Sequence, residues 1–129
     1  EGIIYLTEQG TKIGCGEPGV AILTNSDSVF CAGNGLIIGI HSYVDGCAII
    51  RTEKDDYVSY SNLKTSGLCR GDVVHKGTFL GFAGISDDDR CRQVNVMILD
   101  KEAKYFSIKK LLERLRCNAA CEEPRGYIL

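Results

Sequence analysis

Short apolar runs recur along most of the chain, and glycine, asparagine and aspartate residues separate them. The runs lie at 29–32, 35–40, 47–51, 57–60, 78–84 and 93–99. Runs of this length, rich in β-branched and aromatic residues and bounded by turn-forming residues, are typical of β-strands. Because no helical pattern lies between them, we expect a mainly β fold built as an antiparallel sheet, sandwich or barrel.

The run at 93–99 alternates strictly, which places successive side chains on opposite faces of a strand. One set is wholly apolar and contains Val94, Val96 and Ile98. The other set mixes polar and apolar residues: Gln93, Asn95, Met97 and Leu99. We therefore expect the mixed face to be partly exposed, as the floor of a groove would be.

The pattern changes near the C-terminus, where a short α-helix is predicted over 107–117. Its apolar positions recur at the spacing of one helical stripe: Ile108, Leu111, Leu112 and Leu115. Ser107 is a suitable N-cap residue. A helix this short needs a surface to pack against, and we expect that surface to be its own domain.

Composition describes an ordinary globular chain of 129 residues, which suits one domain over 1–129. Hydrophobic residues make up 44% and charged residues 25%, and the formal net charge is −2. A net charge of −2 gives no indication of the basic surface that a nucleic-acid-binding protein would need. No apolar run is long enough to span a bilayer, so we expect no membrane insertion in this segment.

The chain has seven cysteines, which is many for its length. They are Cys15, Cys31, Cys47, Cys69, Cys91, Cys117 and Cys121. Disulfides in an oxidising compartment would use most of them, and an odd number would leave one thiol over. The alternative is that they are reduced and act as small apolar residues. The sequence leaves both open.

Patterns for catalysis are scarce. The two histidines, His41 and His75, belong to no H-x-H or H-E-x-x-H arrangement, and no C-x-x-C pair occurs. Cys31 could pair with either histidine as a nucleophile and base, but seven cysteines offer such a pair by chance. The acidic run at 87–89 is typical of a solvated loop. We therefore expect no catalytic residues, no metal and no cofactor.

Longer motifs carry a family resemblance. Residues 71–84 read GDVVHKGTFLGFAG, and residues 57–63 read YVSYSNL. They resemble the G-D-x-V-x-x-G-x-x-I-G-x-x-G and Y-x-x-Y-x-H-L motifs of the M23 peptidase domain, also called the LytM or lysostaphin-type domain. Residues 17–22 and 93–97 are similar to its H-x-G-I-D-I and H-L-H-F-E segments. The resemblance covers 16–99 and implies the β fold of that family, of the duplicated-hybrid-motif type.

The resemblance also implies where a zinc site would lie. Active members hold zinc through the His and Asp of H-x-x-x-D and the second His of H-x-H, and two further histidines assist catalysis. The matching positions here hold Glu17, Ala21, Asn62, Gln93 and Asn95. None is the family's residue. A methyl group cannot bind a metal, and neutral amide oxygens are poor zinc ligands compared with imidazole.

We therefore expect a non-catalytic binding or regulatory module derived from a zinc peptidase fold. Its former active-site groove would be lined by six residues: Glu17, Ala21, Tyr60, Asn62, Gln93 and Asn95. These side chains would either bind a peptide or glycan or merely solvate a disused face. By resemblance alone, we expect the chain to act outside the cytoplasm, in the periplasm or cell envelope of a bacterium. There it would bind a protein partner or a peptidoglycan fragment.

Two other functions stay open at this point. One is a cell-wall hydrolase with a non-standard site, either metallopeptidase-like or cysteine-dependent. The other is a carrier domain of the biotinyl or lipoyl type, since such domains share the 71–84 motif in weaker form. A carrier needs a lysine at a hairpin tip beside a methionine, whereas the single methionine, Met97, lies inside a predicted strand without an adjacent lysine.

Overall fold

Antiparallel strands dominate the computed structural model, which describes residues 3–5, 12–15, 19–24, 27–42, 46–86, 91–102, 104–114, 116–117 and 126–128. Each of the six predicted runs coincides with a strand, so the mainly β fold is confirmed. In chain order the elements are β1 (Ile3–Tyr5), β2 (Lys12–Cys15), β3 (Val20–Thr24), β4 (Ser28–Phe30), β5 (Gly35–His41), β6 (Cys47–Thr52), β7 (Tyr57–Ser61), β8 (Leu63–Thr65), β9 (Val73–Val74), β10 (Phe79–Ile85), β11 (Arg92–Leu99), α1 (Ile108–Arg114), β12 (Arg116–Cys117) and β13 (Gly126–Ile128).

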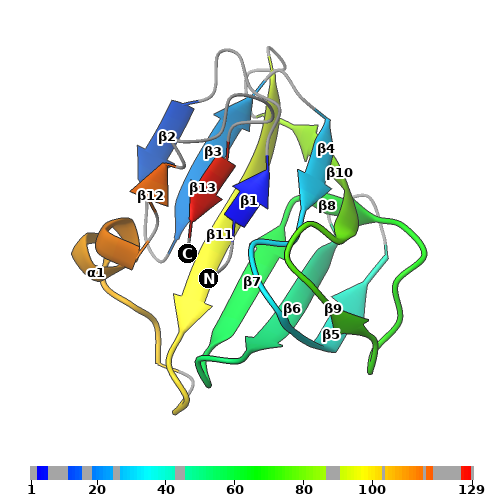
Figure 1. Cartoon of the computed structure of the whole chain (residues 1–129). Coiled ribbons are helices and arrows are strands. Elements are labelled where there is room, and N and C mark those ends of the chain that lie inside the picture. The colour runs from blue at the N-terminus through cyan, green and yellow to red at the C-terminus, as the bar shows by residue number, and fades with distance from the viewer. Residues whose placement is uncertain are drawn as a thin grey trace.

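The strands form a larger and a smaller antiparallel layer that meet at β11. The larger layer, here the main sheet, has the order β2-β3-β11-β7-β6-β5-β9. The smaller layer contains β12, β13, β1, β4, β10 and β8. The two are joined where Gly84 and Ile85 of β10 pair with Gln93 and Arg92 of β11. Figure 1 shows β11 running diagonally, with β3 on one side of it and β7 on the other.

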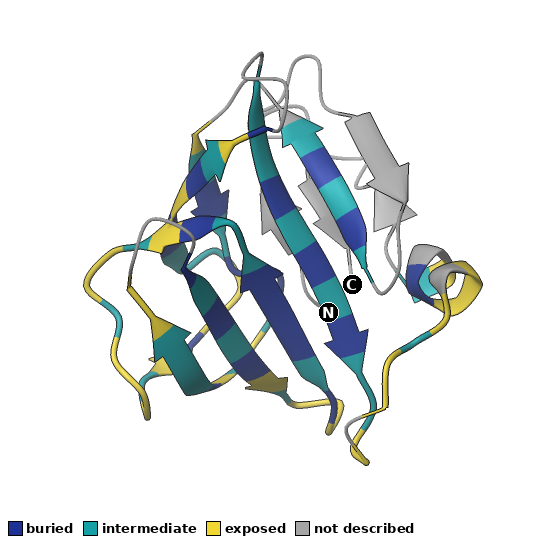
Figure 2. Ribbon diagram, turned by 180° about the vertical axis from the view of Figure 1, so that it is seen from behind, coloured by how far each residue is buried: buried dark blue, intermediate teal, exposed yellow. Residues whose placement is uncertain are grey.

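The core lies on one face of the main sheet. Val94, Val96 and Ile98 of β11 are each at most 1% exposed, while the alternate residues of that strand are half-buried. Figure 2 shows this banding along the strands of the main sheet. The predicted alternation is thus confirmed. We call the opposite, partly exposed side of the main sheet the open face.

The C-terminal helix differs in length from the prediction. Its N-terminus is capped as expected, because Oγ of Ser107 accepts a hydrogen bond from the Lys110 amide at 3.2 Å. The helix ends at Arg114, however, and residues 116–117 pair as a strand with β13. Leu111 docks the helix, since its side chain is fully buried. Within the described residues, no helix is long and apolar enough to cross a membrane.

Gly81 sits at the point where β10 must approach β8 closely. Its φ is +149°, a backbone conformation that side chains rarely adopt, and the β10–β4 register shifts between Phe79 and Gly81. A Cβ atom here would overlap the carbonyl oxygen of Lys64. The position therefore requires glycine on both conformational and steric grounds.

We predict that Gly81→Ala lowers the free energy of unfolding by about 3 kcal/mol, through backbone strain and overpacking. Gly39→Ala on β5 is the matched control, because its Cβ would meet only Ile49 atoms at 3.5 Å or more. Urea unfolding followed by circular dichroism measures both variants. Equal stability of the two variants would contradict this account of β10.

Candidate functional site

One row of side chains crosses the open face where five strands lie in register. Ala21 of β3 pairs with Asn95 of β11, and Asn95 pairs with Ser61 of β7. Ser61 pairs with Cys47 of β6, and Cys47 pairs with His41 of β5. Since neighbouring strands lie about 4.8 Å apart, the row spans about 19 Å. Figure 1 shows these strands side by side.

The amide side chains of Gln93 and Asn95 are joined on this face. Nε2 of Gln93 donates to Oδ1 of Asn95 at 2.8 Å, and both residues are half-buried. Each side-chain amide has a carbonyl oxygen and an NH2 group, so this bond leaves the carbonyl oxygen of Gln93 and the NH2 group of Asn95 for other partners. The pair can therefore both donate hydrogen bonds to and accept hydrogen bonds from an extended peptide backbone that lies across the sheet.

Asn62 has a structural role that its position in the motif does not reveal. Its φ is +57°, a left-handed conformation that asparagine tolerates better than most residues. Nδ2 donates to the main-chain carbonyls of Gln93 at 2.9 Å and Ile85 at 3.3 Å. A Cβ at Gly84 would lie 2.6 Å from Oδ1 of Asn62. The side chain thus fastens the end of β7 to the β10–β11 junction.

Tyr60 does not line the open face, which corrects the sequence-based expectation. Its side chain is 1% exposed and lies on the core side of β7. Its hydroxyl accepts a hydrogen bond from the Ala32 amide at 3.1 Å, and burial raises the pKa of the phenol well above its usual value. Because successive residues of a strand point to opposite faces, Ser61 occupies the place on the open face.

The other predicted site residues fall into two groups. Ala21, Gln93 and Asn95 lie together on the open face, with Asn62 at its margin. Glu17 lies outside the described residues, as does the acidic run at 87–89.

Cys31 is unsuited to the nucleophile role that the sequence left open. It is 1% exposed, its thiol donates to the Gly33 carbonyl at 3.0 Å, and burial raises its pKa. A raised pKa keeps the sulfur as an unreactive thiol near neutral pH. His41 and His75 are both exposed.

Cys47 is the cysteine that faces a histidine. It lies directly opposite His41 across the β5–β6 pair, and it is a half-buried free thiol. Directly opposed residues of antiparallel strands have Cβ atoms about 5 Å apart. Counting outwards from Asp45-Gly46 as a two-residue hairpin turn would pair Cys47 with Val44 instead, so the sequence does not reveal the pairing with His41.

Comparison with solved structures places the chain among M23 folds. A zinc-containing peptidase from Vibrio cholerae matches 82% of the chain with a TM-score of 0.62 at 17% identity. The catalytic domain of the prophage-encoded M23 protein EnpA from Enterococcus faecalis matches 81%, with a TM-score of 0.59 at 16% identity. A structure of the SpoIIIAH–SpoIIQ complex matches 83%, with a TM-score of 0.58 at 12% identity.

The chain has an M23 peptidase-like fold. It spans 38% of the length of the Vibrio peptidase chain, 85% of the EnpA chain and 88% of the matched chain in the SpoIIIAH–SpoIIQ structure. No protein-family model and no curated protein sequence matches it. At these identities the likeness establishes the fold alone.

The residues on the open face do not fit a zinc ion of the family type. The register places Ala21 beside Asn95, the two positions that the motif resemblance matches to the family's Asp and second His, and neither side chain is a good zinc ligand. In the described part of the chain, no group of three or more His, Cys, Asp or Glu side chains could hold a metal. No catalytic step through zinc follows from this site.

We predict that the triple variant Glu17→His, Ala21→Asp, Asn95→His gains a Co²⁺ or Zn²⁺ site, with an affinity at least about 100-fold above that of the parent chain. Visible absorption of Co²⁺ measures this and separates nitrogen and oxygen ligands from thiolates. Ala21→Asp alone is the control, since one carboxylate makes no site. A triple variant without added binding would contradict the assigned positions.

Proposed function

We propose that the chain is a non-catalytic M23-like binding module that holds an extended segment of a protein partner on its open face. The row of Ala21, Asn95, Ser61 and Cys47 carries this proposal. By the motif resemblance, this row corresponds to the place where an M23 peptidase would hold its substrate, and Asn95 and Ser61 offer hydrogen-bonding groups there. A peptidoglycan-type peptide or glycan is the alternative occupant.

The chemistry of the open face suits an extended backbone. Peptide groups alternate donors and acceptors, and the Gln93–Asn95 pair offers both. Met97 and Ile49 flank the row on the same face and are half-buried, so they provide apolar contact beside the polar groups. Specific binding sites are typically lined by apolar side chains with a small number of polar groups among them.

The structural neighbours support a place in the cell envelope and a protein partner. One similar structure is a complex of two proteins, SpoIIIAH and SpoIIQ, and others are peptidases of bacteria. We infer by resemblance that this chain acts outside the bacterial cytoplasm, in the periplasm or envelope. On this proposal it is a pseudo-enzyme that regulates or scaffolds other proteins.

Affinity capture from native envelope, followed by direct binding measurements, tests the open face. We predict that Ser61→Ala with Asn95→Ala weakens binding of the captured partner by about 30-fold, because two lost hydrogen bonds at about 1 kcal/mol each cost about 2 kcal/mol together. Lys76→Ala, an exposed change away from the row, is the control and should leave affinity unchanged. Asn62 is unsuitable for this test because its amide supports the fold.

Unchanged affinity of the double variant would contradict the proposal. In that case, a loss of partner affinity in Lys109→Glu, on the exposed side of α1, would identify the helix as the binding surface. Capture of muropeptides instead of a protein would assign the face to peptidoglycan.

The Cys47–His41 pair favours a second candidate, a cysteine-dependent hydrolase. In such an enzyme the thiolate attacks an acyl carbon, and the imidazolium gives its proton to the leaving group. The resulting thioester is then hydrolysed by water. The pair occupies one end of the same row, so a bound peptide could reach it.

Under this second candidate, we predict that iodoacetamide alkylates Cys47 about tenfold faster than the exposed Cys69 at pH 7, and that His41→Gln removes the difference. Peptide mass spectrometry of the native chain gives both rates. A Cys47 rate at or below that of Cys69 would exclude the hydrolase and leave the binding module.

A further inference from the structure

A second site lies on the core side of the main sheet, away from the open face. Here a hollow that opens to solvent lies between the residues that follow β4, the β6–β7 turn and the end of α1. Its floor includes Ile50, Val58 and Tyr60, each at most 2% exposed. Lys54 and Arg114 stand at its rim.

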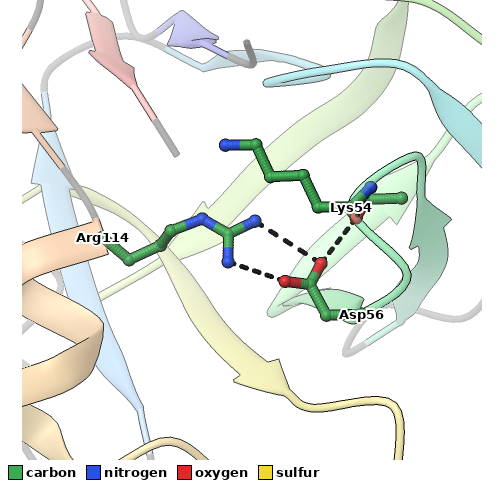
Figure 3. A network of polar contacts seen from close by, with 4 residues as sticks. Lys54, Asp56 and Arg114 are labelled. Atoms are coloured by element: carbon green, nitrogen blue, oxygen red, sulfur yellow. Dashed lines mark hydrogen bonds and ion pairs between the residues drawn. The ribbon is translucent and has the colours of Figure 1, made fainter.

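An ion pair fixes one wall of this hollow. Nη1 of Arg114 donates to Oδ2 of Asp56 at 2.6 Å, and Nη2 donates to Oδ1 at 3.4 Å. Oγ1 of Thr52 donates to the same Oδ1 at 2.5 Å. Figure 3 shows this network. Asp56 is 9% exposed and Arg114 is 18% exposed at their side chains, so the guanidinium is held rigidly.

One donor of this wall has no acceptor. Among the described residues, Nε of Arg114 is the buried side-chain nitrogen or oxygen for which the structure provides no hydrogen-bond partner. A buried N–H without an acceptor is costly, so an acceptor from outside the chain would be bound favourably there. Both oxygens of Asp56 already serve the other two nitrogens.

Lys54 also lines this hollow and adds positive charge to it, and Figure 3 shows its side chain on the same side of Asp56 as the Arg114 guanidinium. An ammonium group has three donors, so it can serve a ligand in addition to its other contacts. Glu53, also at the rim, is exposed and carries the opposite charge. The polar atoms of the floor are already satisfied, because the Tyr60 hydroxyl bonds the Ala32 amide and the Cys31 thiol bonds the Gly33 carbonyl.

We propose that this hollow binds a small aliphatic carboxylate. One carboxylate oxygen accepts hydrogen bonds from Nε of Arg114 and from the Lys54 ammonium. The short aliphatic body rests against Ile50 and Val58. The same chemistry is offered by a free short-chain acid and by the C-terminal residue of a peptide that ends in a small side chain.

NMR titration of the ¹⁵N-labelled full chain tests this with isobutyrate and N-acetyl-alanine as probes. The matched neutral probes are isobutyramide and N-acetyl-alanine amide. We expect saturable shifts at Thr52 and Lys54 with the carboxylates and affinities about tenfold lower with the amides, because charge-assisted hydrogen bonds are the stronger kind. The tighter of the two carboxylates identifies the source of the ligand.

Two variants separate ligand binding from folding. Lys54→Gln should weaken carboxylate binding about tenfold, whereas Lys64→Gln, an exposed change on β8, should leave it unchanged. Arg114→Lys keeps a positive charge for Asp56 but removes the Nε–H, and circular dichroism reports whether it folds. Glu53→Gln should tighten binding. Equal binding of acids and amides, or no saturable shift, would overturn the proposal without affecting the open face.

Discussion

The register of β11 between β3 and β7 is the constraint on which the core and the open face both depend. Because side chains alternate along a strand, one register places Val94, Val96 and Ile98 in the core and Asn95 beside Ala21 and Ser61. A slip by one residue would exchange the two faces and expose the apolar set. Burial of the apolar side chains of β11 therefore also determines where the polar side chains of the row lie.

This coupling means that the M23-like fold does not depend on which side chains occupy the open face. The fold is held by apolar burial and by antiparallel pairing, neither of which needs a metal. Ala21, Gln93 and Asn95 point away from the core, so replacements there leave packing intact. Asn62 shows that such a position can acquire a structural use, since its amide bonds two main-chain carbonyls.

Much of the fold follows from local pattern. Apolar runs between turn residues locate the strands, and Ser107 correctly predicts the start of α1. Tyr60 and Asn62 show where pattern fails: simple alternation would put them on one face, but the left-handed backbone at Asn62 ends the alternation. The pairing of Cys47 with His41 depends on a register that includes an irregularity, and the Arg114–Asp56 bridge joins residues far apart in sequence. Neither leaves a local signal.

If the proposed function is correct, the open face binds no zinc. Anomalous diffraction at the zinc edge, from crystals of the full chain grown with added zinc, tests it most directly because it locates the metal. That location matters in a chain with seven cysteines, which could bind zinc elsewhere. The account predicts no anomalous peak beside Ala21 and Asn95. A fully occupied zinc at that row would contradict it.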